Sequence, residues 1–133
     1  MTTDAMKRTT EAGGQAIRLV RRMAVVNMAL VALQAVSAGF SLSGYAEAVT
    51  VHVVVAFAMQ AGALVQAVTA LVLWRRGRVP GWLAGLSIGL VVIVFLQLGL
   101  GYRRSFWLHV PLGVGIFGGL TRQVTRLRQF AKQ

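Results

Sequence analysis

The fold of this chain is decided by an uncharged stretch of sequence, VTVHVVVAFAMQAGALVQAVTALVL (residues 49–73). It is longer than the roughly 20 apolar residues that a helix needs to cross a bilayer. Three more apolar stretches lie near residues 23–42, 82–100 and 106–120. These stretches are continuous rather than alternating, and backbone groups in lipid must satisfy their own hydrogen bonds. The sequence therefore predicts four membrane-spanning helices and excludes a membrane barrel.

The composition agrees with a membrane protein. The 133 residues are 56% hydrophobic with a mean hydropathy of +0.68, far more apolar than a soluble domain. The net charge is +11, and all Lys and Arg except Arg103 and Arg104 lie on one side of the predicted spans. The positive-inside rule then predicts a multi-pass protein of the bacterial inner (plasma) membrane with both termini in the cytoplasm. The basic residues flank spans and are not interleaved with aromatic residues, so anionic lipid head groups rather than nucleic acid are the expected counter-charges.

The predicted organisation has one membrane domain between two tails. Residues 1–17 are expected to form a cytoplasmic N-terminal tail with little sequence-encoded structure. Residues 18–128 form the four-helix unit, and residues 129–133 form a cytoplasmic C-terminal tail. A cleavable signal peptide is a less suitable interpretation of the first span, because its apolar run continues past the small residues that would form a cleavage site.

The two histidines of the chain begin two similar segments. These are HVVVAFAMQAG (residues 52–62) and HVPLGVGIFGG (residues 109–119), and each is followed by a glutamine fourteen residues after its histidine. The preceding spans also match, with VALQ at residues 31–34 and VFLQ at residues 94–97. The sequence thus predicts an all-α, integral membrane four-helix bundle made of two repeated helical hairpins.

Helical spacing predicts that both histidines face the interior of this bundle. One face of the second span carries His52, Ala56, Met59, Ala63 and Gln66, and one face of the fourth carries His109, Gly113, Ile116, Leu120 and Gln123. A polar stripe on the first span contains Asn27, Gln34, Ser37 and Ser41. Ionisable side chains inside a membrane are rare and functional by default, so these faces predict one shared site.

The predicted depth of the two histidines in the membrane depends on whether residues are counted from the outer loops or from the cytoplasmic side. Each lies five residues after a charged residue of an outer loop, Glu47 or Arg104. From the cytoplasmic side the intervals differ, with 23 residues from His52 to Arg75 and 13 from His109 to Arg122. We take the outer measure, which puts both rings at one depth near the outer face.

Two histidines without further ligands favour haem over other metal groups. A closed zinc site needs four ligands, and the chain has no cysteine and no acid within its spans. Haem needs only two axial ligands from the protein, here His52 and His109. Small residues such as Ala56 and Gly113 would admit a flat macrocycle, and Arg103 and Arg104 would pair with its propionates. The absence of Cys-x-x-Cys-His excludes covalent attachment and leaves haem b.

The four-helix unit with one histidine on its second span and one on its fourth resembles one half of the haem A synthase family. It also resembles uncharacterised four-helix membrane proteins of actinobacteria with the same Leu-Gln and His landmarks. The resemblance implies that His52 and His109 are axial haem ligands and that Glu47 parallels an outer-loop acid of that family. The chain departs from the family in being half as long and in lacking its outer-loop cysteine pair.

The expected function is that of a b-type haem-binding membrane protein, an electron carrier rather than a catalyst. Bis-histidine ligation leaves no open iron position, and no nucleophile–base pair is evident. The electron partner is a quinone or another redox protein. The alternatives are a haem-free accessory subunit of a larger membrane complex and a haem-handling protein related to haem A synthase. Gly81, Gly85 and Gly89 form a small-residue motif that suits a homodimer contact.

Overall fold

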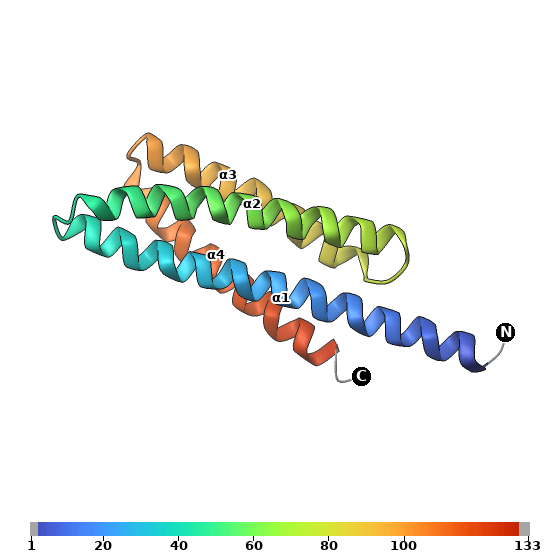
Figure 1. Cartoon of the computed structure of the whole chain (residues 1–133). Coiled ribbons are helices and arrows are strands. Elements are labelled where there is room, and N and C mark those ends of the chain that lie inside the picture. The colour runs from blue at the N-terminus through green and yellow to red at the C-terminus, as the bar shows by residue number, and fades with distance from the viewer. Residues whose placement is uncertain (1–2, 131–133) are drawn as a thin grey trace.

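The computed structural model describes residues 3–130 as a bundle of four helices (Figure 1). The helices are α1 (Thr3–Leu42), α2 (Glu47–Arg75), α3 (Gly81–Tyr102) and α4 (Phe106–Phe130). No strand occurs among these residues. The prediction of an all-α chain with four helices is confirmed.

Each helix packs against two neighbours. Helix α1 contacts α2 and α4, and α3 contacts the same two helices. Within residues 3–130 the backbones of the diagonal pairs do not approach closely, and these helices meet only through side chains in the core. Helix α4 passes behind α1 and packs more extensively against it than against α3 (Figure 1). The α1–α2 and α3–α4 turns lie at one end, here named the outer end. The α2–α3 turn and both termini lie toward the other, the inner end.

The three connections are short and use left-handed backbone positions. Gly44 has a φ of 96° in the α1–α2 turn, and Gly77 has a φ of 65° in the α2–α3 turn. A Cβ atom disfavours such values, which is why glycine is common in these turns. In the α3–α4 turn the left-handed residue is Arg104, with a φ of 54°.

Three helices are long and apolar enough to cross a membrane. They are residues Glu11–Leu42 of α1, together with α2 and α3. Helix α4 is not among them, although it contains the predicted fourth span at residues 106–120. Its apolar run is only fifteen residues long, and Arg122 lies two residues after its end.

The predicted N-terminal tail is helical in its described part, which corrects the expectation of little structure. Helix α1 begins at Thr3 and has 40 residues, so it is about 60 Å long. Ala16 and Val20 are buried against residues of α2, α3 and α4, including Ala70, Leu83 and Leu127. This packing extends the bundle beyond the predicted span, and the sequence-based boundary missed it because the same segment carries charged residues.

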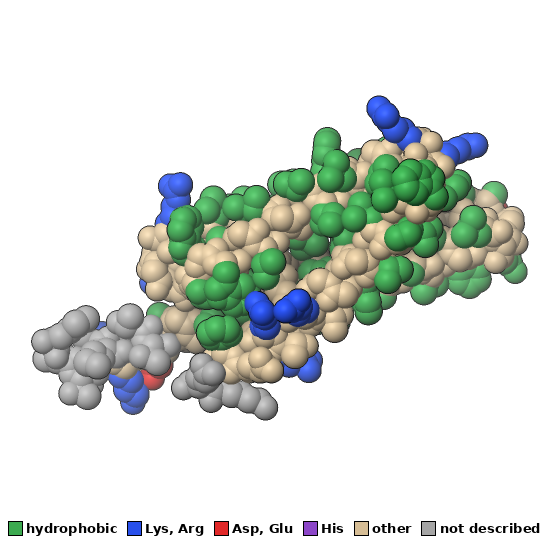
Figure 2. Space-filling model, turned by 180° about the vertical axis from the view of Figure 1, so that it is seen from behind, with side chains coloured by type: hydrophobic (Ala, Val, Ile, Leu, Met, Phe, Trp, Pro, Cys, Tyr) green, Lys and Arg blue, Asp and Glu red, His purple; other side chains and the backbone are tan. Residues whose placement is uncertain are grey.

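The core contains two apolar clusters. The inner cluster contains Ala16, Val20, Ala70, Val79, Leu83, Ala84 and Leu127. The cluster nearer the outer end contains Ala24, Val31, Met59, Ala63, Leu90, Val94, Ile116, Leu120 and Val124. Many large apolar side chains also lie on the surface, where hydrophobic groups cover much of the visible helices (Figure 2). A soluble monomer rarely exposes so much apolar surface, whereas helices in contact with lipid do.

Candidate functional site

The two histidines lie side by side near the outer end. The centroids of the His52 and His109 rings are 6.3 Å apart, and the ring planes are inclined by 54°. Both side chains are half-buried between the helices. Rings this close cannot differ in depth by the ten residues that the inner measure implies, so both rings lie at one depth, as the outer measure predicts. Their position near an outer membrane face stays a prediction.

Each histidine ring is oriented by a backbone carbonyl of the preceding helix. His52 Nδ1 lies 3.2 Å from the carbonyl oxygen of Gln34, and His109 Nδ1 lies 3.0 Å from that of Gln97. A carbonyl oxygen only accepts, so both Nδ1 atoms carry the proton and donate it. The Nε2 atom of each neutral ring then keeps its lone pair. This tautomer is the one in which a histidine binds a metal through Nε2, with its other nitrogen fixed by a hydrogen bond.

The two histidines differ in their remaining contacts. Ser37 Oγ lies 3.1 Å from His52 Nδ1 and donates to the Gln34 carbonyl at 3.1 Å, so this ring has a second acceptor. On the other side, Gln97 Nε2 donates to the backbone oxygen of His109 at 2.7 Å. The Gln97 side chain therefore bridges α3 and α4.

The other predicted site residues lie around this pair. Ala56 and Gly113 are half-buried, each one turn after a histidine. A Cβ added at Gly113 would lie 3.1 Å from Gln97 Nε2, so the space at this glycine is used by the Gln97 side chain. Arg103 and Arg104 form the α3–α4 turn at the outer end, and both are exposed.

A glycine that the sequence did not single out packs against the site. A Cβ at Gly101 would lie 3.1 Å from His109 Cε1 and 3.4 Å from its Nδ1. A side chain at this position would push the His109 ring from its place. The pattern offered no signal for this, because glycines are common in membrane helices.

The geometry of the pair is compatible with one metal ion between two imidazoles. A ligating imidazole nitrogen lies about 2 Å from a metal, so two rings on opposite sides of one ion have centroids roughly 6 Å apart. The observed 6.3 Å agrees with this separation. No cluster of three or more His, Cys, Asp or Glu side chains occurs in the described part of the chain. Two histidines alone would therefore need a group that brings further ligands of its own.

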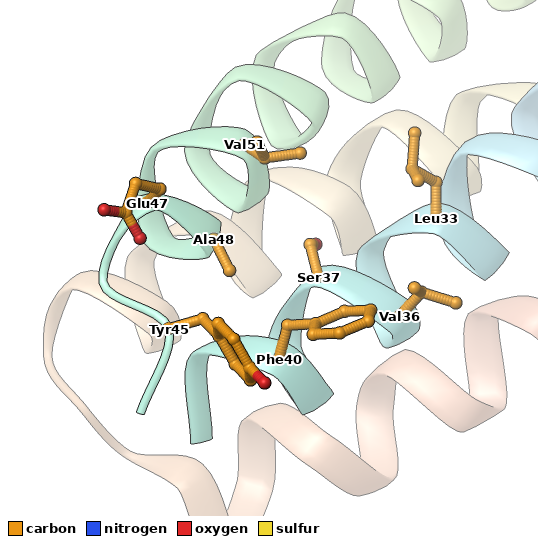
Figure 3. A pocket seen from close by; sticks show the side chains of 8 residues that line it. All are labelled: Leu33, Val36, Ser37, Phe40, Tyr45, Glu47, Ala48 and Val51. Atoms are coloured by element: carbon orange, nitrogen blue, oxygen red, sulfur yellow. The ribbon is translucent and has the colours of Figure 1, made fainter. Parts of the chain in front are cut away.

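A cavity of about 310 Å³ lies beside His52, between the outer ends of α1 and α2 (Figure 3). Ser37, which contacts the His52 ring, lines it together with apolar side chains such as Val36. Phe40 and Tyr45 pack edge to face in its wall, with centroids 5.5 Å apart. The exposed Glu47 is at its outer end, with the carboxylate pointing away from Phe40 (Figure 3).

A buried polar layer crosses the bundle between the two apolar clusters. It contains one residue from each helix, namely Asn27, Gln66, Ser87 and Gln123. Gln66 is its centre, because its Oε1 accepts from Asn27 Nδ2 at 3.0 Å. The Gln66 Nε2 donates to Ser87 Oγ at 3.2 Å and to Gln123 Oε1 at 3.5 Å. The sequence pattern predicts inward positions for Asn27, Gln66 and Gln123 but not for Ser87, although Ser87 is the only polar residue in the first half of α3 apart from Trp82.

The glycine motif predicted for a homodimer is divided between two environments. A Cβ at Gly81 would lie 2.9 Å from Trp74 Nε1, so Gly81 provides space for a contact within the chain. Cβ atoms at Gly85 and Gly89 would meet nothing within 4 Å. Only these two positions are open to a second molecule.

Comparison of the chain with protein-family models, curated proteins and solved structures finds no match.

Proposed function

We propose that this chain is an integral membrane protein that binds one haem b between His52 and His109 near its outer end. The observation that carries the proposal is the matched orientation of the two rings. In each case Nδ1 donates to the carbonyl of the glutamine in a Leu-Gln pair on the preceding helix, and Nε2 is left as a ligand.

The matched contacts also support two repeated hairpins. The interval from glutamine to histidine is eighteen residues in one hairpin and twelve in the other, yet the same carbonyl-to-ring bond is made in both. The outer turn absorbs the difference in length. This is the behaviour expected of two copies of one unit whose function depends on the histidine rather than on the loop.

The protein residues would hold and tune the group in defined ways. His52 and His109 would be its axial ligands, and Gln34, Gln97 and Ser37 would fix the rings and increase their basicity through hydrogen bonds. The exposed Arg103 and Arg104 at the outer end would be available to propionates. When bound, the haem would supply a one-electron couple, and its two histidines would leave no position for oxygen.

The electron would be exchanged with a quinone or with a partner protein. The cavity between α1 and α2 supports a quinone, because its wall is mostly apolar and it shares Ser37 with the hydrogen bonds of His52. Its volume is near the lower limit for small-molecule sites. We also propose that the chain lies in the bacterial plasma membrane with both termini in the cytoplasm.

The test is an optical spectrum of the detergent-purified protein, oxidised and then reduced with dithionite. The wild type is compared with His52→Ala, His109→Ala and, as a matched control, Ser41→Ala on the polar stripe of α1. We expect a Soret band and a sharp low-spin α band in the wild type and the control. Each histidine variant should lose the band or become high-spin, because one axial ligand is removed.

A protein without bound haem would contradict the proposal. A helical, monodisperse wild type without Soret absorbance, even when haem is supplied during expression, would exclude the haem protein. That result would favour the alternative of a haem-free accessory subunit of a larger membrane complex. Low-spin haem that persists in both histidine variants would show that the group is bound elsewhere.

A further inference from the structure

The polar layer shows that α4 carries charge at an unexpected depth. Gln123 lies level with Gln66 and Ser87 because their side chains are hydrogen-bonded neighbours within the layer. Arg122 is the adjacent residue and is exposed. From Gln66, α2 continues for nine residues to Arg75, which is about 13 Å. The start of α3 at Gly81 lies six residues below Ser87, about 9 Å. Arg122 therefore lies well inside the depth that α2 and α3 present to lipid.

Other arginines occupy the same side of the bundle. Arg126 is exposed one turn further along α4. On α1, which packs against α4, Arg22 is exposed five residues before Asn27 of the layer, or about 7 Å below it. At the levels of Arg22 and Arg126 along the bundle axis, α1 and α4 carry basic side chains, whereas α2 and α3 are still apolar. This difference explains why the two histidines have unequal distances to the first inner arginine.

The two acids whose side chains the structure describes, Glu11 and Glu47, lie far from these arginines. The three acids are Asp4, Glu11 and Glu47. Glu11 precedes Asn27 by sixteen residues on α1, and Glu47 precedes Gln66 by nineteen on α2. At 1.5 Å per residue these acids lie about 24 and 28 Å from the layer. Neither Glu11 nor Glu47 reaches Arg122, which leaves this arginine open to an anion of another molecule.

The face of α4 that carries Arg122 continues outward as a strip of glycines. Gly119, Gly118 and Gly115 precede Arg122 by three, four and seven residues, which is the spacing of one helix face. A Cβ at each of them would meet nothing within 4 Å. The strip is therefore an open face without side chains that leads along α4 to Arg122.

We propose that this face binds one anionic phospholipid of the inner leaflet. The lipid phosphate pairs with Arg122 and Arg126, since a guanidinium binds phosphate through parallel hydrogen bonds. One acyl chain lies along the glycine strip toward the outer end. The proposal needs the membrane embedding of the proposed function but not the haem. An acidic helix of a partner protein is the competing occupant of this face.

The experiment measures phospholipid retained by the full-length protein. Wild type, Arg122→Gln/Arg126→Gln and the matched outer control Arg103→Gln/Arg104→Gln are purified in mild detergent with added phosphatidylglycerol or phosphatidylcholine. Native mass spectrometry then counts bound lipids. We expect the wild type and the outer control to retain phosphatidylglycerol but not phosphatidylcholine. The inner variant should retain roughly tenfold less, because each arginine near the head group contributes to binding.

A further variant and a competitor separate the contribution of the arginine charges to lipid binding from that of the glycine strip. Gly119→Leu keeps both charges but fills the strip, and it should also reduce retention. Inorganic phosphate should not displace the lipid, since the acyl chain contributes to binding. Circular dichroism of every variant checks that the helices are intact. If a variant unfolds, single substitution of Arg122 or Arg126 by Lys replaces it, with a smaller loss expected.

Three results would overturn the proposal. They are equal retention by the inner variant, equal binding of phosphatidylcholine, and displacement by inorganic phosphate alone. Co-purification of a stoichiometric protein through these arginines, with no retained lipid, would also contradict it. The absorbance of the same samples reports on haem, so failure of the haem proposal is seen separately from failure of lipid binding.

Discussion

At the scale of single residues, the absence of a side chain at Gly62 allows the polar layer to form. A Cβ at this position would lie 2.5 Å from Asn27 Oδ1 and 3.4 Å from its Cγ. Asn27 is only 1% exposed, so it has no room to retreat. Gly62 belongs to the small positions that follow His52, and its role is to admit a neighbouring amide rather than a cofactor.

We predict that Gly62→Ala destabilises the bundle by about 1–3 kcal/mol, because the added methyl group overpacks a buried contact. The matched control is Gly39→Ala on α1, where a Cβ meets nothing within 4 Å. That variant should be neutral or gain up to about 1 kcal/mol, since alanine favours a helix more than glycine does. Unfolding of both variants in a denaturing detergent, followed by circular dichroism, gives the comparison. Equal changes in the two would mean that the Asn27 contact is unimportant.

At the scale of elements, the polar layer fixes how the four helices are rotated and shifted relative to one another. Helix pairs in lipid gain little from the hydrophobic effect, and interhelical hydrogen bonds contribute to their association. Gln66 is 0% exposed and bonds to side chains on all three other helices. A change in its position would disturb the whole cross-section.

We predict that Gln66→Leu lowers the free energy of unfolding by about 2 kcal/mol, since three interhelical bonds of about 0.6 kcal/mol each are lost. Gln60→Leu on the same helix is the control. Gln60 is half-buried, and its Oε1 has no hydrogen-bond partner among the described residues, so its replacement should cost little. The same unfolding assay separates the two variants. A larger loss in Gln60→Leu would contradict the role given to the layer.

The helix faces were predictable, whereas the contacts that orient the site were not. Polarity and 3.6-residue spacing were enough to place His52, Gln66 and Gln123 toward the interior, because a long apolar helix has few other positions for them. The carbonyl oxygens that hold the rings leave no trace in the sequence, since every residue has one. The sequence also gave no sign that α1 continues as packed helix before residue 18. There the charged side chains conceal the buried Ala16.

At the scale of the whole molecule, the distribution of charge defines two unequal ends. The basic side chains in Figure 2 gather toward the termini, apart from a pair at the opposite end. Helix α1, at about 60 Å, is roughly twice as long as a bilayer core is thick. Under the proposed orientation, its basic first half projects into the cytoplasm.

Accessibility of single cysteines tests this orientation, because the natural chain has none. Ser43→Cys in the α1–α2 turn should react with a membrane-impermeant maleimide in intact cells. Gln129→Cys near the end of α4 should react only after the membrane is opened, since the arginines retain that end inside. Both positions are exposed, so a difference in labelling reports the side of the membrane. Labelling of Gln129→Cys in intact cells would reverse the assigned orientation.

The spacing between the histidine pair and the polar layer has a consequence for how this sequence can change. In α2 and in α4 the histidine precedes the layer glutamine by fourteen residues, which is about 21 Å. Each of these helices is thus held at two points that must stay on one face. Insertion or deletion of a single residue between them would turn one point by about 100° relative to the other. Indels should therefore be tolerated in the two outer turns, whose lengths already differ, and rejected throughout residues 52–66 and 109–123.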